Sequence, residues 1–226
     1  MAGGGKAARQ RGPTGKGMAP VIYEKWFCLS RMKIGLFGGS FDPVHFGHLL
    51  VAQAAREEMA LQRVFFILAA RSPFKPESQP APAAERLRLL RLALAGDATA
   101  EVDDQEIRRG GVSYTIDTAR QYRKNFRQAE LFYLIGADQA GQLSLWRDAA
   151  ELASLVEFVI IPRPGENVPR LEAPFRGQAL RGFPLGVSSS EIRARCRAGL
   201  TINHLTPPAV AEAIKNNRLY LPAKTS

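Results

Sequence analysis

The chain has 226 residues, of which 46% are hydrophobic, enough for the core of one α/β domain. No apolar run reaches the length of a membrane-spanning helix, so a protein anchored by such a helix is not expected. The only two cysteines, Cys28 and Cys196, lie far apart, which argues against a disulfide framework or a zinc site and favours a reducing cytoplasm.

The net charge of +10 is unevenly distributed. Residues 1–31 carry six basic side chains and one acidic one, half of the total charge, in a glycine-rich stretch without hydrophobic period. We expect residues 1–31 to be a disordered basic leader and residues 32–222 to form the domain. There are two alternatives for residues 1–31: they form a transit peptide, or the natural protein starts at Met32. A nucleic-acid-binding protein is the alternative for the whole chain. The remaining charge is spread without a long basic run, which suits a phosphate-rich substrate better.

The hydrophobic pattern from residue 33 onward predicts strands alternating with helices. Short apolar runs predict strands over 33–37, 63–70, 100–107, 131–138 and 155–164. Helices are expected over 48–60, 84–96, 113–126, 145–152, 188–199 and 207–217, and loops over 71–83 and 165–182. Such alternation indicates βαβ units and therefore a mostly parallel sheet flanked by helices, with a small helical part at the C-terminus. Ligands bind such sheets beyond the carboxyl ends of the strands.

The stretch GGSFDPVHFGH, residues 38–48, follows the first predicted strand and leads into a helix. Glycine allows positive φ angles and close approach of the backbone to a ligand. The N-terminus of a helix attracts anions, and His45 and His48 can add N–H donors there. We therefore expect a phosphate site. A metal site at the two histidines and an ordinary glycine turn are the alternatives.

A second motif, SSSEIRAR, spans residues 188–195. Ser188 followed by Glu191 is a capping-box pattern that starts a helix, with Arg193 one turn inside. Taken alone, this pattern is typical of any well-capped surface helix. Serine hydroxyls and backbone N–H groups are expected at the N-terminus of this helix.

The first motif resembles the HxGH signature of a nucleotidyltransferase superfamily with a Rossmann-like α/β fold, with His45, Gly47 and His48 filling the signature. The second resembles the ISSTxIR motif of the same superfamily, with Val187 in place of Ile and Ser190 in place of Thr. The resemblance implies catalytic roles for His45, His48 and Arg193. It also implies ATP binding by the following residues: Gly38, Gly39, Ser40, Phe41, His45, Gly47, His48, Ser188, Ser189, Ser190 and Arg193.

Further segments, GGVSYTIDT at 110–118 and LIGADQ at 134–139, resemble the bacterial nicotinate-nucleotide adenylyltransferases. The resemblance implies that Trp146 stacks on the pyridine ring of the acceptor, although a core tryptophan is the alternative. Thr115 matches a position near the nicotinate carboxylate, and Asp138 is expected at ribose hydroxyls or as a helix N-cap. Lys75 matches a loop lysine of the family, but Phe74 replaces the usual histidine, so a solvated loop lysine is equally open.

The resemblance implies transfer of the adenylyl group of ATP to nicotinate mononucleotide, giving deamido-NAD and pyrophosphate, in NAD biosynthesis in the cytoplasm. Mg²⁺ is expected as cofactor, held by ATP phosphates and water rather than by protein ligands. Another phosphate acceptor, such as nicotinamide mononucleotide or phosphopantetheine, is the alternative substrate. The oligomeric state, a homo-oligomer included, is left open by the sequence.

Overall fold

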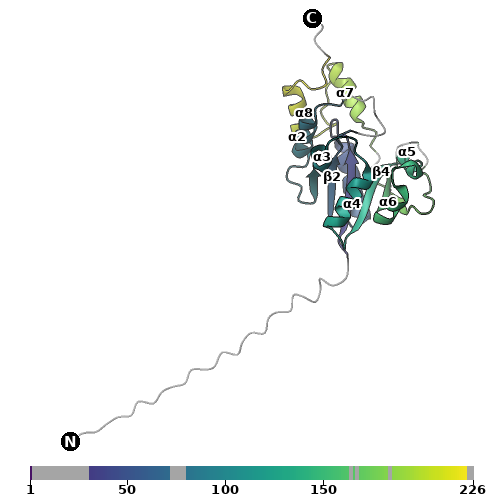
Figure 1. Ribbon diagram of the computed structural model, residues 1–226. Helices are drawn as coiled ribbons and strands as arrows, with labels where there is room; N and C mark the ends of the chain where they lie inside the picture. Colours follow the sequence, from purple (N-terminus) through teal and green to yellow (C-terminus); the bar gives the residue numbers. More distant parts are fainter. Residues whose placement is uncertain (2–30, 72–79, 163–164, 166–167, 183–184, 223–226) are drawn as a thin grey trace. The chain divides into compact units, whose positions relative to one another are not determined.

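The computed structural model describes residues 1, 31–71, 80–162, 165, 168–182 and 185–222. Every element described below belongs to the unit Arg31–Ser226 (Figure 1). Residues 2–30 lie outside the described part, so the predicted leader over 1–31 and domain over 32–222 stay predictions.

Six parallel strands form one sheet in the order β3-β2-β1-β4-β5-β6. The strands are β1 (Lys33–Gly39), β2 (Arg63–Leu68), β3 (Ala100–Asp103), β4 (Glu130–Gly136), β5 (Glu157–Ile161) and β6 (Gly177–Ala179). The predicted α/β class with a parallel sheet is confirmed. Because the strands are parallel, their carboxyl ends meet at one edge, and the loop after the inner strand β1 leaves from that edge.

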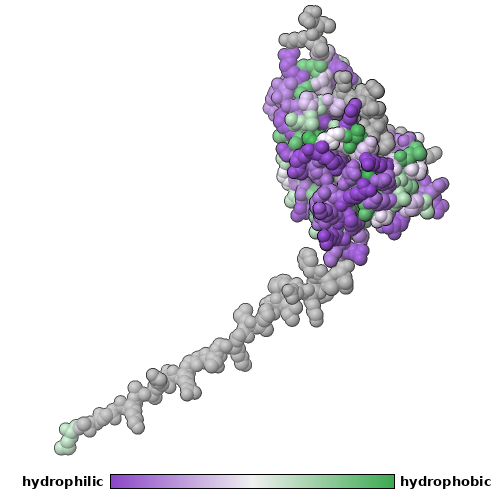
Figure 2. All heavy atoms as spheres, viewed as in Figure 1, coloured by the Kyte–Doolittle hydropathy of each residue, from purple (hydrophilic) through white to green (hydrophobic). Residues whose placement is uncertain are grey.

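Helices connect the strands and cover both faces of the sheet (Figure 1). They are α1 (Phe46–Glu58), α2 (Ala83–Ala93), α3 (Gln105–Arg109), α4 (Thr115–Asn125), α5 (Ala137–Ala140), the 3₁₀ helix η2 (Leu143–Leu145), α6 (Ala149–Leu155), α7 (Ser189–Arg197) and α8 (Pro208–Asn216). The outer surface over α3 and α4 is dominated by hydrophilic residues (Figure 2). In the described part of the chain, no helix has the length and apolar character that a bilayer crossing demands.

Two hydrophobic clusters lie on opposite faces of the sheet, because successive side chains of a strand point to opposite sides. In β2, Val64 and Phe66 belong to the cluster that includes residues of α1, α2, α7 and α8, whereas Phe65 and Ile67 belong to the cluster with α4, α5 and α6. Strands buried on both faces are apolar throughout, which explains why simple apolar runs located most of them.

The structure differs from the predicted elements in several places. The strand predicted over 100–107 ends at Asp103, whose Oδ1 accepts the Gln105 N–H at 2.8 Å in a turn that starts α3. Within the predicted loop 165–182, residues 177–179 form strand β6 through pairing with β5. Trp146 and Asp148 interrupt the helix predicted over 145–152, and α1 begins at Phe46 rather than at His48.

Candidate active site

The loop between β1 and α1 lies at the carboxyl edge of the sheet and carries the first motif. Neither Gly38 nor Gly39 has a positive φ. The left-handed residue of the loop is Phe41, with φ of 43° and a buried ring. These glycines are required by packing instead. A side chain on Gly38 would overlap the Tyr133 hydroxyl, and one on Gly39 would press on the Phe41 ring.

His45 and His48 lie at the start of α1 with their rings stacked, the ring centroids 3.7 Å apart. His48 Nδ1 accepts the backbone N–H of His45 at 3.2 Å. Because Nδ1 is an acceptor, the proton of a neutral His48 ring sits on Nε2, which becomes a donor. At Gly47 a Cβ would lie 3.0 Å from the His45 ring and 3.4 Å from Val187 O, so this glycine makes room for the histidine and for the approach of the second motif.

Both histidines are held in the neutral form. Burial lowers the pKa of His45 to about 4, and burial together with the nearby His45 lowers the pKa of His48 well below its usual value. His45 is only 6% exposed. Its side chain faces the His48 N–H in a capping box, but its Nδ1 makes no hydrogen bond of good geometry among the described residues. A buried polar atom without a partner indicates a place for a ligand group.

The N-terminus of α1 offers fewer amides than we expected. The N–H of Phe46 donates to Leu205 O at 3.1 Å, and that of His48 donates to His45 O at 2.9 Å. For the Gly47 N–H, the described residues supply no acceptor. The Gly47 amide is therefore the first-turn donor that an anion can use.

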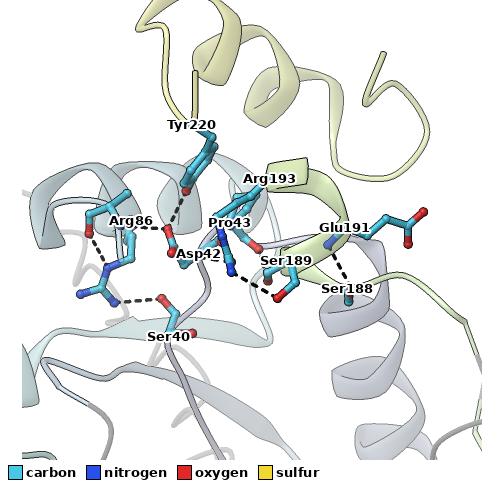
Figure 3. A network of polar contacts seen from close by, with 11 residues as sticks. Ser40, Asp42, Pro43, Arg86, Ser188, Ser189, Glu191, Arg193 and Tyr220 are labelled. Carbon is cyan, nitrogen blue, oxygen red and sulfur yellow. Dashed lines mark hydrogen bonds and ion pairs between the residues drawn. The ribbon is translucent and has the colours of Figure 1, made fainter. Parts of the chain in front are cut away.

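The second motif lies against the first. Ser188 is the N-cap of α7 and accepts the Glu191 N–H at 3.1 Å, which confirms the predicted helix start. Ser189 donates its hydroxyl proton to Pro43 O at 2.8 Å, in the loop of the first motif. While Ser189 keeps this bond, it has no proton left for a phosphate, so its observed contact holds the two motifs together (Figure 3).

Arg193 joins the same contact. Its guanidinium donates to Asp42 O at 2.7 Å and to Ser190 Oγ at 3.2 Å. The side chain is 29% exposed, and a guanidinium has five N–H donors, so donors remain for a bound anion. The two motifs, about 150 residues apart in the sequence, thus form one site at the carboxyl edge of the sheet.

Arg86 in α2 is a site residue that we did not predict. It is 2% exposed, and it donates to Ser40 O at 2.9 Å, to Ala69 O at 3.0 Å and to Ala81 O at 2.9 Å. It therefore ties the ends of β1 and β2 to the start of α2. In the sequence Arg86 stands among other arginines of the same helix, and no local signal marks it as the buried one.

Thr115 and Trp146, two of the residues predicted at the acceptor, meet at Tyr133. Thr115 begins α4, and its hydroxyl donates to the Tyr133 hydroxyl at 3.4 Å. Trp146 lies edge-on to Tyr133, the ring centroids 6.4 Å apart. The Tyr133 hydroxyl also occupies the space beside Gly38, so these residues adjoin the first motif.

The two other residues predicted to bind the acceptor are Asp138 and Lys75. Asp138 lies exposed in the first turn of α5, directly after β4, but the N-cap of that helix is Gly136. Lys75 lies outside the described residues. Beside the acceptor residues, the guanidinium of Arg147 lies over the Tyr114 ring, 4.7 Å from its centroid, a contact that the sequence did not predict.

The chain is similar in sequence to proteins of known family. The family model described as cytidylyltransferase-like matches residues 36–195. A protein of Opitutus terrae named "Probable nicotinate-nucleotide adenylyltransferase" is 44% identical over 195 residues, which are 85% of this chain and all of that protein. A protein of the same name from Thermus thermophilus is 42% identical over 189 residues, 84% of this chain and all of that protein.

The fold also matches solved structures. The nicotinic acid mononucleotide adenylyltransferase of Plasmodium falciparum, complexed with NaAD, superposes with a TM-score of 0.71 at 16% identity, covering 84% of this chain and 98% of the other. At this identity the likeness concerns the fold alone. The family predicted from the two motifs and from the segments over 110–118 and 134–139 is confirmed by the sequence relatives: the chain belongs to the cytidylyltransferase-like family and, within it, to the nicotinate-nucleotide adenylyltransferases.

Proposed function

We propose that the protein transfers the adenylyl group of ATP to nicotinate mononucleotide, giving deamido-NAD and pyrophosphate. The observation that carries the proposal is the pair of neutral, stacked histidines at the N-terminus of α1, with the Nδ1 of His45 buried and unpaired among the described residues. The sequence relatives named for this activity support it.

The proposed reaction needs little covalent chemistry from the protein. The 5′-phosphate of the mononucleotide is already an anion, so its oxygen attacks the α-phosphorus of ATP without a general base, and the bond to the β-phosphate oxygen breaks. Negative charge builds on the α-phosphate oxygens and on the leaving pyrophosphate. In this proposal the Gly47 amide, the neutral histidines and Arg193 donate to these oxygens.

Magnesium enters this proposal with the ATP phosphates. Among the described residues, no group of three or more His, Cys, Asp and Glu side chains could hold a metal ion. Asp42, the carboxylate in the loop, already accepts hydrogen bonds from Tyr220 and Ala81. The donor set therefore fits an ion that phosphates and water hold, and the ion would neutralise charge on the leaving pyrophosphate.

A positive charge beside the acceptor residues supports nicotinate over nicotinamide. Arg147 follows Trp146 directly and lies on the Tyr114 ring, next to Thr115. The two candidate acceptors differ in one ring substituent, a carboxylate or a neutral amide. A guanidinium favours the carboxylate. A cytoplasmic site for the reaction remains part of the proposal and rests on the two separated cysteines.

A pyrophosphate-release assay tests the proposal. The protein is given Mg²⁺, ATP and one acceptor: nicotinate mononucleotide, nicotinamide mononucleotide or phosphopantetheine. We expect the highest kcat/KM with nicotinate mononucleotide, and deamido-NAD as the product in a chromatogram. A higher kcat/KM with either of the other acceptors would contradict the proposed substrate.

The role of Trp146 is tested by the Trp146→Ala and Trp146→Phe variants. Trp146 is 9% exposed and packs in the cluster with α4 and α6, so its truncation should destabilise the fold by about 3–5 kcal/mol. If it also stacks on the pyridine ring, KM for the mononucleotide rises far more than KM for ATP, and the phenylalanine variant keeps part of the affinity. If the KM values for the mononucleotide and for ATP rose equally, Trp146 would be a core residue without a role in binding the pyridine ring.

A further inference from the structure

Tyr220, near the C-terminal end of the described residues, reaches back to the loop of the first motif. Its hydroxyl donates to Asp42 Oδ1 at 2.8 Å, across 178 residues of sequence (Figure 3). Burial and the Asp42 carboxylate raise the pKa of Tyr220, so the hydroxyl keeps its proton and acts as a donor at neutral pH. This tyrosine belongs to neither motif.

Asp42 carries a buried carboxylate in the loop of the first motif. Its side chain is 6% exposed. Oδ1 accepts from Tyr220 and, at 3.2 Å, from the Ala81 N–H, whereas Oδ2 lies 3.7 Å from the Arg193 guanidinium. A distance of 3.7 Å is too long for a hydrogen bond. Of the two hydrogen bonds that the described residues donate to this carboxylate, the one from the Tyr220 hydroxyl is the shorter.

The loop is held from three sides. Arg86 donates to Ser40 O, Arg193 donates to Asp42 O, and Tyr220 donates to the Asp42 side chain (Figure 3). Of these three donors, Tyr220 is the neutral one. If it is lost, the buried carboxylate has to be compensated by a neighbouring cation. Arg193, 3.7 Å from Oδ2, is the one that can approach it, because Arg86 is fixed by three carbonyl groups.

We propose that Tyr220 is a positioning residue for adenylyl transfer: by satisfying Asp42 it keeps the loop in place and leaves Arg193 free to donate to the phosphates of ATP. The proposal rests on the proposed function for the role of ATP. Without the hydroxyl, Arg193 closes onto the Asp42 carboxylate and is withdrawn from the phosphates. The defect therefore concerns ATP and not the mononucleotide.

The test is the Tyr220→Phe variant with a matched control. Tyr122→Phe removes the same kind of bond elsewhere, since the Tyr122 hydroxyl donates to Asp103 Oδ2 at 2.6 Å between α4 and the edge strand β3. Both variants should lower the melting temperature. We expect Tyr220→Phe to reduce kcat/KM for ATP about tenfold, the size of one lost hydrogen bond, with KM for nicotinate mononucleotide unchanged. Tyr122→Phe should change neither.

A second substitution separates positioning from folding. In the Tyr220→Phe background, Asp42→Asn removes the charge that attracts Arg193, so kcat/KM for ATP should recover part of its loss. Calorimetric titration with α,β-methylene-ATP follows nucleotide binding without turnover, and Tyr220→Phe should weaken it. If the wild type binds this analogue but adenylates none of the acceptors, the proposed function fails while the titration still tests Tyr220. Equal ATP kinetics and equal analogue binding in Tyr220→Phe and Tyr122→Phe would overturn the proposal.

Discussion

Replacing His48 by alanine is expected to lower kcat for adenylyl transfer about 10²–10³-fold, the usual cost of removing one donor from a charge-stabilising site. The Nε2 proton of His48 is assigned as a donor because its Nδ1 accepts from the His45 backbone. A bond that strengthens as charge builds on the phosphates affects kcat more than the KM for ATP. The measurement is steady-state pyrophosphate release with ATP and nicotinate mononucleotide.

The His48→Ala variant should fold, with a modest loss of stability. His48 is half-buried, and its edge meets the Phe41 ring at a centroid distance of 5.0 Å, so alanine removes that contact and one capping bond. His48→Asn can both accept and donate, and we expect it to restore part of the rate. His204→Ala, at the exposed third histidine, is the control and should behave as the wild type. Turnover of His48→Ala within threefold of the wild type would remove His48 from the reaction.

Most of the sheet could be predicted from the sequence because its strands are buried on both faces and therefore read as apolar runs. The exceptions have physical reasons. Gly177–Ala179 contains no apolar run, and it becomes strand β6 only because the backbone of β5 pairs with it. The end of β3 depends on a side-chain turn at Asp103, which a hydrophobic pattern does not show.

Some residues of the candidate site could likewise be predicted from the sequence, and others could not. His45, Gly47 and His48 are adjacent in sequence, so a motif could reveal them. Arg86 and Tyr220 act through burial and through contacts across 46 and 178 residues, which a sequence pattern does not show. The sequence also could not show why two positions of the first motif are glycine. A side chain at Gly38 would overlap the Tyr133 hydroxyl, and one at Gly47 would press on the His45 ring.

Acid should destabilise the protein through His45 before most carboxylates titrate. The pKa of His45 is lowered from 6.5 to about 4 by burial, so between these values the unfolded chain binds a proton that the folded chain does not. Stability is therefore complete above pH 6.5 and declines as the pH falls toward 4. The shift corresponds to about 3 kcal/mol at 1.36 kcal/mol for each pKa unit, and His48 acts in the same direction.

Urea unfolding of the wild type at pH 7.5, 6.0 and 4.5 measures this loss. His45→Asn removes the titrating ring and should flatten the decline, although its stability at pH 7.5 is lower because a buried side chain has been exchanged. Glu106, whose pKa burial raises, acts in the opposite direction but is present in every variant, so its contribution cancels. His204→Gln, a change at an exposed histidine, should keep the wild-type decline. If His45→Asn and the wild type lost the same free energy of unfolding between pH 7.5 and 4.5, His45 would not be the buried neutral histidine on which the proposed phosphate site depends.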